Sequence, residues 1–182
     1  MKANPSIAIG VTGSIAAFKS AELVSALVKN NFDVHVIMTE SARKLVTEKT
    51  FLTLSRNPVI TSFWDLPEWE PGHIALADKA VLLAVVPCTA NFIGKYASGI
   101  ADDALSTYAL SHRGKVLLAP AMNTAMWKHP AVIKNCETLI SRGTIFCGPS
   151  TGHLACGTDG EGRLEDISVI HSRILELCAE KE

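Results

Sequence analysis

The sequence predicts a doubly wound α/β domain, in which helices cover both faces of a parallel sheet. Short apolar runs alternate with longer segments of helical periodicity along the 182 residues, and glycines and prolines cluster where these segments meet. Strands that alternate with helices form βαβ units, whose right-handed crossovers give parallel pairing. We therefore expect a flavodoxin-like, Rossmann-like sheet in a single domain over residues 1–182.

Five strands are expected, each an apolar run that ends in small or polar residues: 6–10, 34–38, 80–86, 115–119 and 144–147. The run 80–86 is apolar at every position, which is typical of a strand buried on both faces of a parallel sheet. Helices are expected between the strands, where apolar residues recur at helical spacing: 15–30, 41–54, 90–111, 130–142 and 166–180. The segment 56–72, with three prolines and two tryptophans, is expected to be irregular.

Composition and charge exclude several classes of protein. The chain is 48% hydrophobic and 19% charged, which is too apolar for a disordered protein. No stretch reaches the ~20 unbroken apolar residues of a membrane-spanning helix. The net charge of −1 and the lack of a basic block argue against nucleic acid as a partner. The absence of a signal-peptide pattern predicts a cytoplasmic protein with free thiols, and the large apolar fraction predicts a homo-oligomer.

Small and polar residues follow each strand, and ligands of such sheets bind beyond the carboxyl ends of the strands. After the first strand, residues 10–14 (GVTGS) lead into a helix N-terminus, where backbone N–H groups and Ser14 suit a single phosphate, as in FMN. The same residues can also form an ordinary tight turn. They match neither G-x-G-x-x-G nor a Walker loop, so a dinucleotide or triphosphate is not expected. Thr39 and Ser41 either cap the next helix or contact a cofactor.

Five further residues carry chemically capable side chains. Asn123 follows the fourth strand, and its amide either completes a turn or binds a ligand carboxylate. Met126 and Trp127 either pack in the core or form the wall of a site for a flat ring. His73, at a loop–helix junction, is either a base near neutral pH or a capping residue. Cys156 lies among four glycines within eleven residues, where a thiol is either reactive or an idle surface group.

Five motifs, in this order and spanning most of the chain, resemble the flavin-containing cysteine decarboxylase family. They are Gly13-Ser-Ile-Ala-Ala-Phe-Lys19, His73-Ile-Ala-Leu76, Pro87-Cys-Thr-Ala-Asn-Phe92, Pro120-Ala-Met-Asn-Thr-Ala-Met-Trp127 and Ala155-Cys-Gly-Thr-Asp-Gly-Glu-Gly-Arg163. The fourth matches the family signature P-x-M-N-x-x-M-W in full. The third departs from the usual P-A-S-A-N-T, because Phe92 removes a hydroxyl where a flavin contact is expected.

The resemblance implies an FMN-dependent lyase that decarboxylates phosphopantothenoylcysteine to phosphopantetheine in coenzyme A biosynthesis. It implies that ten residues line the FMN: Gly13, Ser14, Ile15, Thr39, Ser41, Thr89, Ala90, Asn91, Phe92 and Ala121. By the same resemblance, His73 is a base or proton-transfer residue, Asn123 binds the substrate carboxylate, and Cys156 donates the proton of the last step.

The family resemblance has three further implications for the site. Met126 contributes to substrate binding beside the carboxylate-binding residue. The chain forms trimers or multiples of trimers, up to a dodecamer, with FMN and substrate between neighbouring subunits. A mobile glycine-rich loop, about residues 149–165, covers the substrate.

Two other functions stay open from the sequence. A peptidyl-cysteine decarboxylase makes a C-terminal enethiol and, in this family, lacks the loop thiol, so Cys156 favours the first interpretation. A non-catalytic FMN-binding regulatory subunit would bind FMN without turnover. No metal site is expected, because no cysteine and histidine cluster has ligand spacing.

Overall fold

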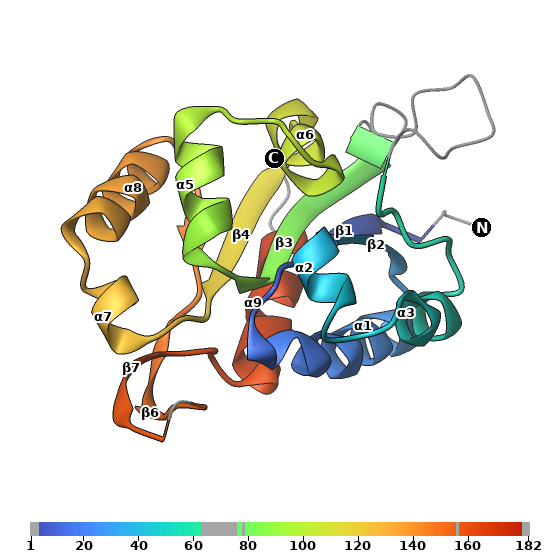
Figure 1. The fold of residues 1–182 in the computed structure, drawn as a ribbon. Coiled ribbons are helices and arrows are strands. Elements are labelled where there is room, and N and C mark those ends of the chain that lie inside the picture. Colours follow the sequence, from blue (N-terminus) through green and yellow to red (C-terminus); the bar gives the residue numbers. More distant parts are fainter. Residues whose placement is uncertain (1–3, 63–75, 78, 156, 180–182) are drawn as a thin grey trace.

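The computed structural model describes residues 4–62, 76–77, 79–155 and 157–179 (Figure 1). Its main sheet has five parallel strands in the order β2-β1-β3-β4-β5. Their bounds are β1 Ser6–Val11, β2 Asp33–Met38, β3 Ala80–Cys88, β4 Lys115–Pro120 and β5 Ile145–Phe146. This is the flavodoxin-type strand order, so the predicted fold class is confirmed.

Helices cover both faces of this sheet (Figure 1). The helices on one face, which share a core with β1, are α1 Lys19–Lys29, α3 Glu48–Ser55 and α9 Ile167–Ala179. Those on the other face are α5 Ala90–Ser98, α6 Ala104–Ser111 and α8 Pro130–Ser141. Three shorter helices follow strand ends: η1 Ile15–Phe18, α2 Glu40–Arg43 and α7 Thr124–Trp127. Among the described residues, no helix is long and apolar enough to cross a membrane.

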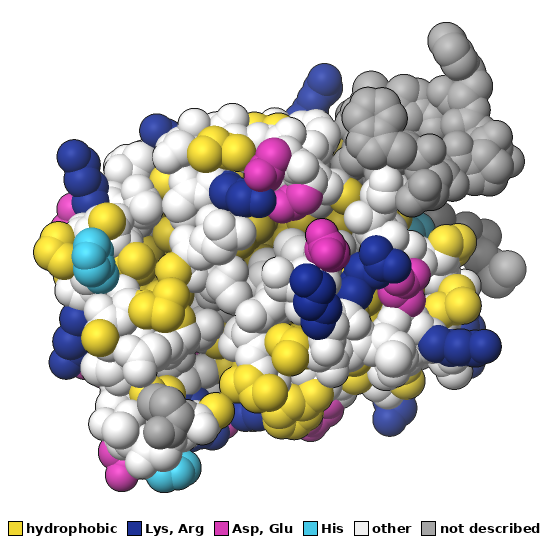
Figure 2. Space-filling view, in the orientation of Figure 1, with side chains coloured by type: hydrophobic (Ala, Val, Ile, Leu, Met, Phe, Trp, Pro, Cys, Tyr) yellow, Lys and Arg dark blue, Asp and Glu magenta, His cyan; other side chains and the backbone are white. Residues whose placement is uncertain are grey.

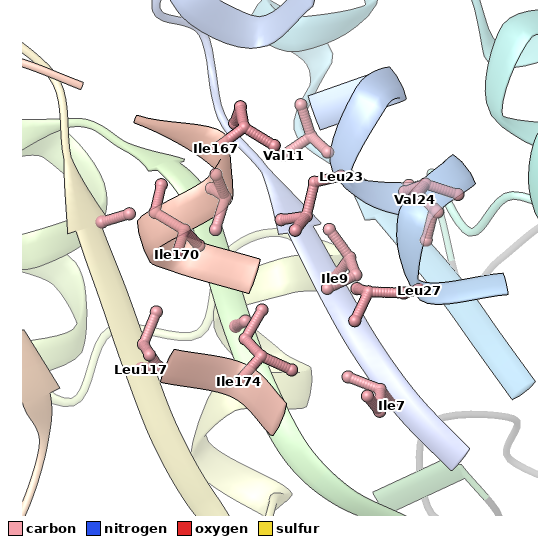
Figure 3. Close-up of a cluster of buried hydrophobic side chains, with 14 of the residues drawn as sticks. Ile7, Ile9, Val11, Leu23, Val24, Leu27, Leu117, Ile167, Ile170 and Ile174 are labelled. Atoms are coloured by element: carbon pink, nitrogen blue, oxygen red, sulfur yellow. The ribbon is translucent and has the colours of Figure 1, made fainter. Parts of the chain in front are cut away.

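The central strands alternate their side chains between the two cores. Ile7 and Ile9 pack with α1 and α9 (Figure 3), whereas Ala8 lies in the cluster with α5 and α6. Leu82 and Leu83 of β3 divide between the two clusters in the same way, and both are at most 1% exposed. Because both faces are covered, β3 needs apolar residues on both sides, as its sequence predicted. Each fully buried side chain of this size contributes about 1.5–3 kcal/mol of hydrophobic free energy.

Two predicted helices are each interrupted. The segment 41–54 forms α2 and α3, and the segment 90–111 forms α5 and α6. Gly99 ends α5 with a left-handed φ of 71°, which a glycine adopts without steric cost. Asp103 then starts α6 with a reciprocal capping box. Apolar periodicity runs through both segments, so it did not show these stop and start signals.

The glycine-rich segment after β5 is not a bare loop. It forms a two-stranded antiparallel sheet of β6, Ser150–His153, and β7, Asp159–Arg163. The mobility predicted for residues 149–165 stays a prediction. Of the segment 56–72, residues 63–72 lie outside the described residues, and Ile60 forms an isolated parallel bridge with Ile37.

Candidate active site

Thr12 ties the carboxyl ends of β1 and β3 together. Its side chain is 1% exposed, and its hydroxyl donates to the Pro87 carbonyl (2.8 Å) and accepts from the Thr89 N–H (3.0 Å). Ser20, at the start of α1, donates its hydroxyl to the Val86 carbonyl (2.5 Å). A buried donor or acceptor without a partner costs free energy, so these bonds fix the turn after β3 against β1.

Two backbone bonds extend this arrangement to the neighbouring strands. The Thr39 N–H donates to the Val11 carbonyl (3.0 Å), joining the end of β2 to that of β1. The Ala121 N–H donates to the Cys88 carbonyl (3.0 Å), joining the end of β4 to that of β3. Residues that follow four separate strands therefore share one rim.

This rim borders a cavity of about 900 Å³, which is the size of a small-molecule site. Figure 2 shows the hollowed face of the molecule. All ten residues predicted to contact FMN line the cavity: Gly13, Ser14, Ile15, Thr39, Ser41, Thr89, Ala90, Asn91, Phe92 and Ala121. Asn123 and Met126 line it too, whereas His73 and Cys156 lie outside the described residues.

The Gly13–Ser14 turn brings a helix N-terminus to the cavity. A Cβ on Gly13 would overlap the Ser41 side chain, so only glycine allows α2 to lie this close. The Ser14 hydroxyl accepts from the Ala16 N–H (3.4 Å) and caps η1, which continues directly into α1. Backbone N–H groups and the helix dipole at this place suit a phosphate group, so the residues present fit a flavin mononucleotide.

Thr39 and Thr89 both serve as helix caps at the cavity wall. The Thr39 hydroxyl accepts from the Ala42 N–H (3.3 Å), and the Thr89 hydroxyl accepts from the Phe92 N–H (3.5 Å). Phe92 is 2% exposed and its ring stacks on Tyr96, with ring centroids 5.9 Å apart. The core therefore accommodates this ring. Phe92 offers no side-chain hydroxyl to the cavity, although the family pattern has a threonine at this position.

Asn123 makes the turn contact that its sequence position left open, and it also lines the cavity. Its side-chain oxygen accepts from the Ala125 N–H (2.8 Å) and caps α7, while the residue stays exposed at the cavity. The cap fixes which way the amide points, and its nitrogen is the end that can donate to a carboxylate. Met126 is 48% exposed and lines the cavity, whereas Trp127 packs against the core.

Three charged residues that sequence reasoning did not identify also line the cavity. The Lys95 ammonium lies 2.6 Å from an Asp102 oxygen and 2.9 Å from an Asp103 oxygen. Burial opposes the charge on Asp103, but hydrogen bonds from Lys95 and Ser106 outweigh it and hold the pKa of Asp103 below its ordinary value. Burial likewise opposes the charge on Lys95, and the two carboxylates nevertheless raise its pKa. The break at residue 99 brings these groups together, and helical periodicity did not show that break.

The four described cysteines are free, and none is an activated thiol. Burial raises the pKa of Cys88, Cys136, Cys147 and Cys178. A thiol with a raised pKa stays protonated near neutral pH and is a poor nucleophile. These four therefore behave as small hydrophobic side chains.

The fold and the cavity define a doubly wound α/β protein with a nucleotide-type ligand site at the carboxyl edge of its sheet. The chain matches the Flavoprotein family over residues 1–179 and belongs to that family.

Curated relatives of the chain are bifunctional proteins of coenzyme A biosynthesis named CoaBC. The protein of Bacillus subtilis (strain 168) is 47% identical over 166 residues, which cover 90% of this chain and 40% of that protein. The protein of Borreliella burgdorferi is 41% identical over 182 residues, which cover 100% of this chain and 47% of that protein. The chain thus spans less than half the length of these relatives.

Solved structures of decarboxylases share the fold. The FMN-dependent cysteine decarboxylase SpaF superposes with a TM-score of 0.83 at 29% identity, covering 97% of this chain and 99% of that chain. A PPC decarboxylase mutant complexed with pantothenoylaminoethenethiol superposes with a TM-score of 0.89 at 25% identity, covering 97% of this chain and 100% of that chain.

Replacing Asp103 with asparagine tests the ion-pair network at the cavity wall. Asparagine caps helices as well as aspartate, so Asp103→Asn removes the charge and keeps the cap. Because the folded protein lowers the pKa of Asp103, its charged form stabilises the fold at pH values above the unfolded carboxyl pKa of about 3.9. This stabilisation is lost as the pH falls through the lower folded value. We expect urea unfolding to show a less stable variant at pH 7 and a narrowing difference below about pH 4.

Glu176→Gln is the control, because Glu176 pairs with Arg173 on the surface, where its side chain is 60% exposed. Exposed pairs contribute little, so its stability should follow that of the wild type. A stability difference for Asp103→Asn that stays constant between pH 7 and pH 3.5 would show that the charge is not involved.

Proposed function

We propose that this chain catalyses FMN-dependent decarboxylation of phosphopantothenoylcysteine to phosphopantetheine, a lyase reaction of coenzyme A biosynthesis. The observation that supports this best is the single cavity that joins the Gly13–Ser14 turn to Asn123. The names of the relatives point the same way: CoaBC is a coenzyme A biosynthesis protein, and a PPC decarboxylase shares the fold. The proposed reaction belongs to the cytoplasm.

FMN is the proposed cofactor, held by the ten residues that line the cavity from four strand ends. Ser14 and the N–H groups of the adjoining helix N-terminus would take its phosphate, as the close approach of Gly13 to Ser41 supports. Thr89 and its neighbours on α5 would take the flavin side of the cofactor. When bound, FMN supplies an electron sink that accepts two electrons and returns them.

Asn123 is the proposed carboxylate-binding residue. Its amide is neutral, so it donates a hydrogen bond to the substrate carboxylate without the strong charge pairing that would hold the negative charge there. That charge must pass to the rest of the substrate when neutral CO2 leaves. The cap on α7 holds the amide in one orientation, which reduces the entropy lost when substrate binds. Met126, exposed one helical turn further on, would pack against the apolar part of the substrate.

Two proton-handling roles rest on the sequence motifs alone. His73 is proposed to accept or move a proton, and Cys156 is proposed to donate a proton to the carbon next to the one that carries sulfur. In the net reaction the bond to the carboxylate carbon breaks, CO2 leaves, and a proton takes its place without net oxidation.

A homo-oligomer, as a trimer or a multiple of trimers, is also proposed. Ile15 and Phe18 are each 61% exposed and border the cavity, and apolar side chains gather along the lower edge of the hollow in Figure 2. Exposed apolar groups next to a ligand site favour contact with another subunit. We further propose that residues 1–182 act as one flavoprotein domain in which segment 149–165 covers the substrate; His153, Leu154 and Arg163 of this segment line the cavity.

A second candidate function is peptidyl-cysteine decarboxylation to a C-terminal enethiol. The observation that favours it is the likeness to SpaF, an FMN-dependent cysteine decarboxylase, over nearly the whole chain. Its product would be unsaturated and peptide-borne, so product mass separates the two proposals.

The test is mass spectrometry of the product after anaerobic incubation of the FMN-loaded protein with phosphopantothenoylcysteine. Loss of CO2 to give saturated phosphopantetheine is expected. Asn123→Asp is the matched control, because its carboxylate repels that of the substrate and should block the reaction while FMN stays bound. An enethiol product, or no reaction with FMN bound, would contradict the proposal; no reaction would favour the peptide substrate or the non-catalytic FMN-binding role.

Replacing Cys156 with serine tests the proposed last proton transfer. A serine hydroxyl is a much weaker acid than a thiol, so Cys156→Ser should release CO2 and stop at the enethiol, with two electrons left on the cofactor. The expected product is two hydrogens lighter than phosphopantetheine by mass spectrometry. Saturated product at the wild-type rate would exclude Cys156 as the proton donor.

A further inference from the structure

Strand β7 contacts both sequence neighbours of Asn123. The Met122 N–H donates to the Gly162 carbonyl (2.9 Å), and the Thr124 hydroxyl donates to the Glu161 carbonyl (2.7 Å). The residue proposed to bind the substrate carboxylate therefore lies between two hydrogen bonds to the same strand.

Two glycines allow this close approach. A Cβ on Gly160 would overlap the Thr124 hydroxyl, and a Cβ on Gly162 would overlap the Met122 carbonyl oxygen. Gly162 also has a φ of 122°, which side chains other than hydrogen rarely allow. The fit of β7 against this segment thus requires glycine at two positions on one strand.

Packing holds α7 only in part, because none of its four residues is fully buried and Trp127, at its end, is the one that packs against the described core. An ion pair from this region to β7, between Lys128 and Glu161, spans 3.6 Å between side chains that are 62% and 50% exposed. Water and salt screen such a pair, so it contributes little. Among the described side-chain contacts between α7 and β7, the hydrogen bond from the Thr124 hydroxyl to the Glu161 carbonyl is the one with good geometry.

We propose that β7 sets the position of Asn123 and that Thr124 is the positioning residue that couples them. The hairpin proposed to cover the substrate and the amide proposed to hold its carboxylate then form one unit. A substrate that keeps the hairpin over the cavity thereby also keeps Asn123 in position to bind the substrate carboxylate. This inference rests on the proposed function.

Hydrogen exchange measured by mass spectrometry tests the coupling without any substrate. Thr124→Val removes the hydroxyl and should speed exchange in both 121–124 and 159–163, because the two segments lose their link. Thr124→Ser keeps the hydroxyl and should restore wild-type exchange. Thr151→Val is the control, since Thr151 is exposed on β6 and does not line the cavity. Exchange in 121–124 that stays at the wild-type rate in Thr124→Val would overturn the coupling.

A binding cycle tests what the coupling does for the ligand. The probe is phosphopantothenoylserine, the oxygen analogue of the substrate, with its Kd measured by calorimetry. Thr124→Val should weaken binding about five- to tenfold, and Thr124→Ser should restore it. In an Asn123→Ala background, Thr124→Val should have no further effect, because Thr124 acts through Asn123. An equal loss in both backgrounds would overturn the positioning role.

Two safeguards keep the outcomes distinct. Gly160→Ala pushes β7 away from Thr124 from the opposite side and should reproduce both effects, so the test does not depend on one variant folding. A wild-type protein that fails to bind the analogue would contradict the proposed function and with it the effect on the ligand. The exchange measurement would still decide whether β7 holds the Asn123 segment.

Discussion

The site depends on one buried hydroxyl group. Thr12 donates to Pro87 at the end of β3 and accepts from Thr89 just after that strand, so it holds the ends of β1 and β3 in a single arrangement. The bonds from Thr39 to Val11 and from Ala121 to Cys88 add β2 and β4 to it. Without these links, the segments that line the cavity would be independent loops, each free to move at its own strand end.

The cavity wall divides its functions among its elements. The Gly13–Ser14 turn offers a helix N-terminus, with its dipole and the Ser14 hydroxyl, for an anion, and α7 offers a neutral amide at Asn123. Lys95 adds a cation, but two carboxylates already neutralise it. This part of the wall therefore orders the structure and does not present a free positive charge to a ligand. The hairpin β6–β7 also lines the cavity, and it reaches the Asn123 segment through the Met122–Gly162 backbone bond and the Thr124 hydroxyl.

The sequence predicted the fold well, because a strand buried on both faces has a pattern that few other structures share. The resemblance to the flavin-containing cysteine decarboxylase family implied twelve described site residues, and all twelve line one cavity at the edge where the strand ends of a parallel sheet meet. Sequence reasoning missed Thr12, whose role depends on bonds to residues more than 70 positions away. It missed Lys95 with Asp103 and the β6–β7 pairing, because Gly99 interrupts a continuous apolar pattern and the hairpin residues have no apolar alternation.

The central claim is that the carboxyl-edge cavity holds FMN with its phosphate at the Gly13–Ser14 turn. The most direct measurement is fluorescence titration of the apoprotein with FMN and with riboflavin, in the wild type and in Ser14→Asp. Aspartate keeps the helix cap but repels a phosphate, so FMN binding should weaken at least about tenfold while riboflavin binding changes far less. Equal changes for the two flavins, or no change for FMN, would contradict this placement of the cofactor.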